Sequence, residues 1–175
     1  MTFVLTEEQQ ELSAAVTGFL EKHSAEAAVR RLMEQGGAAD PVVWAQLSGQ
    51  LGLAGLVVPE HYGGGGFGFA DFALVAEAAG AALLVAPLLS TVTAASALLL
   101  SDDEELRSAH LPGLASGDAV GTLAVAEQSG SWDLADTQTT ARLDAGGRTV
   151  LTGVKMFVVD GQYADVFVVS ARGPK

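Results

Sequence analysis

The amino-acid sequence predicts an α+β protein, with an all-α helical domain over residues 1–117 followed by the first part of an antiparallel β domain over residues 118–175. Up to residue 117, apolar residues recur at helical spacing between capping signals and glycine or proline stops. Beyond it, short β-rich runs alternate with turn signals. Because the helices all precede the strands, we expect two segregated units and not an alternating α/β sheet. The strands are few and short, so we expect this sheet to be unfinished.

The first three predicted helices have clear start and stop signals. Thr6 and Gln9 form a capping box that opens the first helix. A second helical stretch covers residues 25–35 and stops at two glycines, and Asp40-Pro41 then supplies an N-cap and an N1 proline for a third helix. The apolar residues that recur along the first and third helices are Leu12, Ala15, Val16, Phe19, Leu20, Val43, Trp44, Leu47 and Leu51.

An uncharged segment over residues 78–100 is long enough to cross a bilayer. Pro87 near its middle, several hydroxyl side chains and acidic flanks without a positive anchor argue against a membrane span. We therefore expect two buried helices that meet near Pro87. A further capping box at residues 101–104 predicts a short helix with Leu106 turned inward, and residues 111–118 have the pattern of a last turn and exit loop.

Composition and charge exclude several classes of function. Apolar residues make up 49% of the chain, which predicts an extensive core, and the formal net charge is −12. No lysine or arginine lies between Leu32 and Leu106, so a nucleic acid partner is not expected. The chain has no cysteine and its three histidines are far apart, so we expect no metal site. The N-terminus lacks the basic region and apolar core of a signal peptide, which predicts a cytoplasmic protein.

Four β-rich runs follow the helices, at residues 119–126, 137–143, 149–155 and 165–170. The first run opens into a loop of small residues. Main-chain N–H groups exposed at such a strand end can bind a planar heteroaromatic ring or a phosphate without a charged side chain. Phe157, just after the third run, can lie against the face of such a ring. The ends of the first and third runs are therefore the candidate binding site.

A glycine run offers a different interpretation. Gly63, Gly65 and Gly68 fit the Gly-x-Gly-x-x-Gly spacing of dinucleotide-binding loops, between an apolar run and a helix. However, Pro59 and the residues after it separate the apolar run from the glycines, and no β-α-β unit follows. The acid expected about 20 residues onward is also missing. A glycine-rich linker between helices is favoured, and a nucleotide-binding domain stays as the third hypothesis.

Several motifs together resemble one known family. Residues 52–66, Gly-Leu-Ala-Gly-Leu-Val-Val-Pro-Glu-His-Tyr-Gly-Gly-Gly-Gly, resemble the Gly-Leu…Pro-Glu-x-Tyr-Gly-Gly-x-Gly signature of the acyl-CoA dehydrogenases. Residues 111–118 resemble the segment by which that family leaves its helical domain. Gly-Val-Lys-Met-Phe at 153–157 and the strand after it resemble its Gly-x-Lys-x-Trp-Ile-Thr region and next strand. The resemblance runs from Leu5 to about Ser170, with the motifs in the family's order.

The resemblance implies FAD chemistry on acyl thioesters. The family fold has a helical domain, a middle β domain and a C-terminal four-helix domain, and the last of these is absent from the sequence. In the family a carboxylate removes the α-proton of an acyl-CoA, and hydride leaves the β-carbon for the flavin. That carboxylate lies in the C-terminal domain, so no residue here is assigned a catalytic role. Glu60, Glu77 and Glu127 are interpreted as surface or structural carboxylates.

Carried over position by position, the resemblance also gives candidate binding residues. Ala126 and Val159 stand where the family has two threonines that hydrogen-bond the flavin, whereas Phe157 keeps an aromatic ring. Two side-chain hydrogen bonds are therefore missing, each worth about 1 kcal/mol, so weaker flavin binding is expected, with main-chain N–H groups at Val125–Ala126 and Phe157–Val159 available instead. Substrate contacts are expected from Ser131 and Trp132. The predicted cofactor contacts are Leu123, Val125, Ala126, Ser131, Trp132, Phe157, Val158 and Val159.

Two functional hypotheses follow from the resemblance. The first is an FAD-dependent acyl-CoA dehydrogenase that carries out a β-oxidation-type step, works as a homo- or hetero-oligomer and passes electrons to electron-transfer flavoprotein or a similar acceptor. The alternative is a non-catalytic partner subunit of a heteromeric acyl-CoA dehydrogenase that has lost its flavin contacts, which Ala126 and Val159 favour. The acyl group, fatty or steroid-like, is not specified by these residues.

Overall fold

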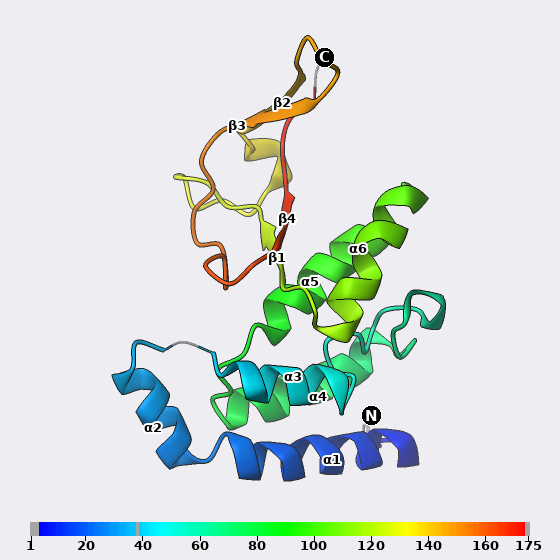
Figure 1. The fold of residues 1–175 in the computed structure, drawn as a ribbon, viewed down its shortest axis with the longest axis vertical. Helices are drawn as coiled ribbons and strands as arrows, with labels where there is room; N and C mark the ends of the chain where they lie inside the picture. The colour runs from blue at the N-terminus through cyan, green and yellow to red at the C-terminus, as the bar shows by residue number, and fades with distance from the viewer. Residues whose placement is uncertain (1–3, 38, 174–175) are drawn as a thin grey trace.

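In the computed structural model, which describes residues 4–37 and 39–173, six α-helices precede four β-strands (Figure 1). This arrangement confirms the predicted α+β class. The helices are α1 (Glu7–His23), α2 (Glu26–Glu34), α3 (Pro41–Gly49), α4 (Phe69–Ala81), α5 (Leu88–Leu99) and α6 (Glu104–Ser116). The strands are β1 (Gly121–Ala124), β2 (Thr140–Leu143), β3 (Thr149–Thr152) and β4 (Val166–Val169), and two 3₁₀ turns are η1 (Glu60–Tyr62) and η2 (Leu134–Asp136).

The helices pack around a shared apolar core. α1, α3 and α4 lie together at the end of the molecule farthest from the strands, and α5 and α6 lie between them and the strands (Figure 1). Val16 of α1, Leu47 of α3, Val75 of α4 and Val92 of α5 are buried in one cluster. The indole N–H of Trp44 donates to the carbonyl of Gly117 at 2.9 Å, which ties α3 to the end of α6. Burial of these side chains supplies most of the drive to fold.

Several predicted helix starts are confirmed by their hydrogen bonds. Thr6 Oγ1 accepts from the N–H of Gln9, and the Gln9 side chain accepts from the N–H of Thr6, which completes the capping box. Asp40 accepts from the N–H of Val42 and caps α3, with Pro41 at its first position. The two helices expected to meet near Pro87 are α4 and α5. No helix within the described ranges has both the length and the hydropathy required of a membrane span.

The prediction for α6 was wrong in three details. Asp103, and not Ser101, is the N-cap, with its carboxylate accepting from the N–H of Leu106 at 2.9 Å. Leu106 is exposed because it lies in the first turn, on the solvent side. The helix also continues through Pro112 to Ser116, where a last turn and exit loop were expected. Proline removes only one main-chain donor, and burial of neighbouring leucines holds the helix together.

The strands form two separate pairs. β2 and β3 are an antiparallel hairpin, as predicted, with Thr140 opposite Thr152. β1 and β4 pair in parallel instead, with Gly121 opposite Val166, which differs from the antiparallel domain that the sequence predicted. Parallel neighbours need a long crossover, and the whole hairpin with its flanking loops supplies it. β1 and β4 lie side by side at the end of α5 and α6, with the hairpin beyond them (Figure 1).

Candidate functional site

The site forms where the chain leaves β1 and β3. The N–H of Met156 donates to the carbonyl of Ala126 at 2.8 Å, so the two segments predicted to form one binding edge lie side by side. At the other side of β1, the N–H of Ser170 donates to the carbonyl of Ala124 at 3.1 Å. The end of β1 is therefore held between the segment after β3 and the end of β4.

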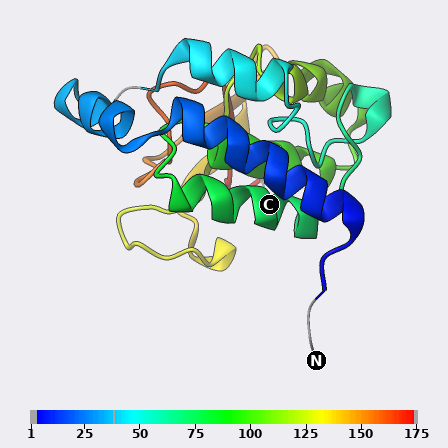
Figure 2. The same cartoon turned by 90° about the horizontal axis from the view of Figure 1, so that it is seen from below.

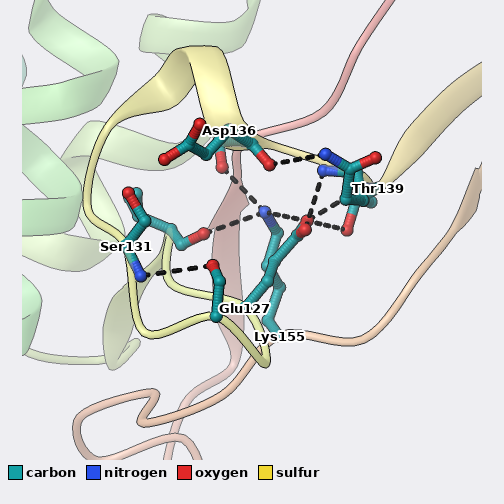
Figure 3. A network of polar contacts seen from close by, with 9 residues as sticks. Glu127, Ser131, Asp136, Thr139 and Lys155 are labelled. Atoms are coloured by element: carbon teal, nitrogen blue, oxygen red, sulfur yellow. Dashed lines mark hydrogen bonds and ion pairs between the residues drawn. The ribbon is translucent and has the colours of Figure 1, made fainter.

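A lysine at the centre of this junction joins all three segments. Lys155 Nζ donates to the carbonyl of Val125 at 3.0 Å, to Glu127 Oε1 at 3.0 Å and to Ser170 Oγ at 2.8 Å. Its side chain is only 9% exposed and that of Glu127 only 11% exposed, so the ion pair is largely shielded from water. Figure 3 shows the two side chains meeting between the loop after β1 and the segment after β3.

The Glu127 carboxylate also fixes the start of β2. It accepts from the N–H of Gln138 at 2.7 Å, from the N–H of Thr139 at 2.8 Å and from the Thr139 hydroxyl at 2.7 Å (Figure 3). The hydrogen bonds from Thr139, with those from Lys155 and Gln138, lower the pKa of Glu127 to about 2 against the opposing effect of burial. A carboxylate with such a pKa is a poor general base at neutral pH. Glu127 therefore acts as a structural anion.

The predicted site residues differ in how far they are exposed. Phe157 is 71% exposed and Val159 is 50% exposed, whereas Ala126 is only 1% exposed. Leu123, Val125 and Val158 are half-buried. The exposed side chains of the candidate site therefore lie mainly in the segment after β3, and the end of β1 packs behind this segment.

Ser131 and Trp132 lie in a different segment of the chain. They belong to the loop between β1 and η2, which projects away from the helices (Figure 2, yellow). Ser131 bonds only to its near neighbours within the described residues, because its N–H donates to Ser129 Oγ and its hydroxyl accepts from the N–H of Asp133. Trp132 is 64% exposed. No hydrogen bond between described residues joins this pair to the segment after β3.

The edge after β3 has the groups that a planar cofactor ring needs. The N–H groups of Phe157, Val158 and Val159 donate to no other residue in the described ranges. These donors and the exposed Phe157 ring fit the polar edge and the flat face of a flavin. The Ala126 side chain adds no donor there, because it is a buried methyl group.

A hollow of about 390 Å³ lies beside this edge. It is bounded by the loop after β1 on one side and by Gly153 and Val154 on the other, with Glu127 and Thr139 in its wall. None of the eight predicted site residues lines it. The hollow is therefore a neighbour of the candidate edge and a separate feature.

The glycine run does not form a phosphate-binding loop. Gly64 and Gly65 donate their N–H groups to the carbonyls of Pro59 and Gly55, and Gly66 donates to Val58. These donors therefore point back into the protein and not toward a ligand. A side chain at Gly64 would lie 2.0 Å from the Val58 carbonyl oxygen, so the run is needed for close main-chain packing.

Sequence reasoning missed the polar residues that hold the edge together. Lys155 appeared only as part of a family motif, and the role of Thr139 was not predicted. The signal available was a lone lysine between apolar residues in a strongly acidic chain, which indicates a buried ionic partner. The identity of that partner needed the three-dimensional arrangement.

Comparison with known proteins identifies the family. The family model described as acyl-CoA dehydrogenase, N-terminal domain, matches residues 6–118, and the chain belongs to the acyl-CoA dehydrogenase family. Acyl-CoA dehydrogenase IpdE2 of Mycolicibacterium smegmatis is 41% identical over 119 residues, which cover 68% of this chain and 37% of the relative.

Two solved structures extend the likeness beyond the helices. In the ChsE4–ChsE5 complex of Mycobacterium tuberculosis, one chain matches 99% of this chain and 46% of its own length, with a TM-score of 0.85 and 29% identity. An acyl-CoA dehydrogenase of Bacillus anthracis complexed with FAD matches 97% of this chain and 29% of its own, with a TM-score of 0.79 and 29% identity. The chain therefore spans less than half the length of these proteins.

Proposed function

We propose that this chain is the front part of an FAD-dependent acyl-CoA dehydrogenase, which forms a double bond between the α- and β-carbons of an acyl-CoA thioester. Family membership and the FAD complex of a similar protein support this proposal. The observation that carries it is the pairing of the strand ends: the segments after β1 and β3 lie side by side, and next to an exposed aromatic ring are three N–H groups that donate to no other described residue.

In this proposal the chain binds and orients the flavin. The N–H groups of Phe157, Val158 and Val159 hold the polar edge of the ring, and the Phe157 side chain covers one face. Lys155 and Glu127 keep the edge fixed, so little reorganisation accompanies binding. When bound, FAD supplies the acceptor for the hydride that leaves the substrate. We assign Ser131 and Trp132 to the substrate side because they lie in the projecting loop.

The catalytic base has a different source. Glu127 is unsuited to it, because its pKa is about 2 and its oxygens are occupied by donors. We infer that the base comes from the part of the family fold that this chain does not cover. We also propose an oligomeric, cytoplasmic enzyme that passes electrons to electron-transfer flavoprotein or a similar acceptor.

Flavin content and turnover test the proposal. The full-length protein is purified and its absorption spectrum is recorded, followed by reduction of an artificial electron acceptor with acyl-CoA substrates. We expect a yellow protein and substrate-dependent reduction. A protein that neither carries nor takes up FAD, alone or with a homologous chain, would refute the proposal.

A second candidate is a non-catalytic partner subunit in a heteromeric dehydrogenase. It is favoured by the missing hydroxyl groups at Ala126 and Val159, and the similar ChsE4–ChsE5 structure is a two-chain complex. In that case the purified protein is colourless and flavin appears only after mixing with a homologous chain. Size-exclusion chromatography with detection of flavin absorbance separates the two candidates.

A further inference from the structure

The segment with the N–H groups of Phe157, Val158 and Val159 has an unfavourable main-chain conformation. Phe157 and Asp160 both have φ of +54°, in the left-handed region that non-glycine residues rarely adopt. The turn between them is closed by the N–H of Gly161, which donates to the carbonyl of Val158 at 3.2 Å. The N–H of Tyr163 donates to the carbonyl of Asp160 at 2.8 Å. Such a conformation persists only where its surroundings hold it.

Two buried hydroxyl groups hold this turn from outside. Ser90, on α5 and only 2% exposed, places its Oγ 2.7 Å from Asp160 Oδ2. Thr122, on β1 and fully buried, donates its hydroxyl to the carbonyl of Val159 at 2.6 Å. Ser90 Oγ also lies 3.1 Å from the carbonyl of Pro87, but the Asp160 carboxylate is closer and is the stronger acceptor.

With a third hydrogen bond, these two contacts fix the segment at both of its ends. At its start, the Met156 N–H is bound to Ala126, and at its end Val159 and Asp160 are bound to Thr122 and Ser90. The N–H groups of residues 157–159 lie between these fixed points. Their direction is therefore set partly by α5, a helix that precedes them by about seventy residues along the chain.

We propose that Ser90 and Asp160 are positioning residues that hold the 157–159 segment in the conformation that binds the flavin. This inference rests on the proposed FAD function. Because Ser90 lies on α5, the helical part of the chain then controls cofactor affinity without touching the cofactor. Asp160 suits this role since a carboxylate accepts the buried hydroxyl, and aspartate tolerates a left-handed φ better than most side chains.

The experiment compares three variants of the full-length protein. Ser90→Ala removes the hydroxyl that reaches Asp160. Ser96→Ala is the matched control, because Ser96 is on the same helix and its hydroxyl donates only to the carbonyl of Val92 at 2.7 Å. Asp160→Asn is the conservative variant, since its amide oxygen still accepts from Ser90 and asparagine tolerates a left-handed φ.

Two readouts separate positioning from a purely structural role. We expect Ser90→Ala to raise the Kd for FAD roughly tenfold, to shift the flavin absorption band and to speed hydrogen exchange at the Gly161 and Tyr163 N–H groups several-fold. Ser96→Ala and Asp160→Asn should keep the Kd within about twofold of the unmodified protein. Thermal unfolding of the FAD-free proteins shows whether the two serine variants are equally stable.

Each outcome has a definite meaning. If the unmodified protein binds FAD and Ser90→Ala binds it as tightly, the positioning role is overturned while the proposed function stands. Equal loss of affinity in Ser96→Ala also overturns it, because the effect is then general to the helix. If the unmodified protein binds no FAD, alone or with a homologous chain, the proposed function fails and this inference fails with it.

Discussion

Replacing Gly153 by alanine should disturb the hydrogen bonds around Glu127 through its effect on Thr139. A Cβ atom at this position would lie 2.2 Å from Thr139 Oγ1 and 2.7 Å from Thr139 Cα. The φ of Gly153 is not left-handed, so the cost comes from the contact and not from main-chain conformation. Because one of the atoms in the way belongs to the main chain, a change of side-chain rotamer cannot relieve the overlap.

The magnitude follows from the size of the forced shift. Inserting one carbon into a packed contact costs about 1–3 kcal/mol, and here the start of β2 must move. Moving Thr139 also weakens the two hydrogen bonds that it donates to Glu127. We therefore expect Gly153→Ala to lower the free energy of unfolding by about 2–3 kcal/mol and to raise the pKa of Glu127.

Urea unfolding at neutral pH measures the effect, with FAD titration of the same samples. Gly18→Ala in α1 is the control, since a side chain there meets no atom within 4 Å. That change should stabilise the protein by about 0.5–1 kcal/mol because alanine favours a helix. The reasoning is refuted if Gly153→Ala unfolds at the same urea concentration as the unmodified protein.

Three other outcomes follow from the structure. The pKa of Glu127 is about 2 in the folded protein and ordinarily 4.5, so its contribution to stability is present above pH 4.5 and is lost as the pH falls toward 2. As the pH is lowered, the urea midpoint of Glu127→Gln should therefore fall less steeply than that of the unmodified protein. Gly117→Ala should destabilise the protein by about 2–4 kcal/mol, because Gly117 has a φ of +79° and the added Cβ atom would lie 2.3 Å from the Ser48 side chain. Thermal unfolding measures this loss, and unchanged stability would contradict the prediction. Val159→Thr adds a hydroxyl at a half-exposed position and should tighten FAD binding about fivefold by fluorescence titration, and unchanged affinity would argue against the site.

The sequence was most informative where the controlling interaction is local. The capping box at Thr6 and the Asp40-Pro41 helix start involve residues three positions apart or fewer, and both were predicted correctly. The course of α6 was not, because Pro112 has the same local signal in a loop and in a helix stabilised by tertiary burial. The parallel pairing of β1 with β4 was also not predicted, because a β-rich run does not indicate whether its partner strand is parallel or antiparallel.

The candidate site shows the same contrast between local and long-range interactions. The motifs placed the two segments in the order and at the positions where the structure brings them together. The bonds that hold them join Lys155 to Glu127, Thr122 to Val159 and Ser90 to Asp160. These pairs are separated by many residues and by several turns, so their meeting depends on packing that one sequence does not reveal.

The parallel pairing of β1 with β4 has a consequence for synthesis. β1 leaves the ribosome well before β4, and the intervening hairpin cannot substitute as its neighbour because it pairs with itself. Until Val166–Val169 emerges, β1 exposes unpaired main-chain groups that can recruit strands from other nascent chains. A ribosome that stalls before these residues would therefore release a helical domain with an unpaired strand that can bind other chains.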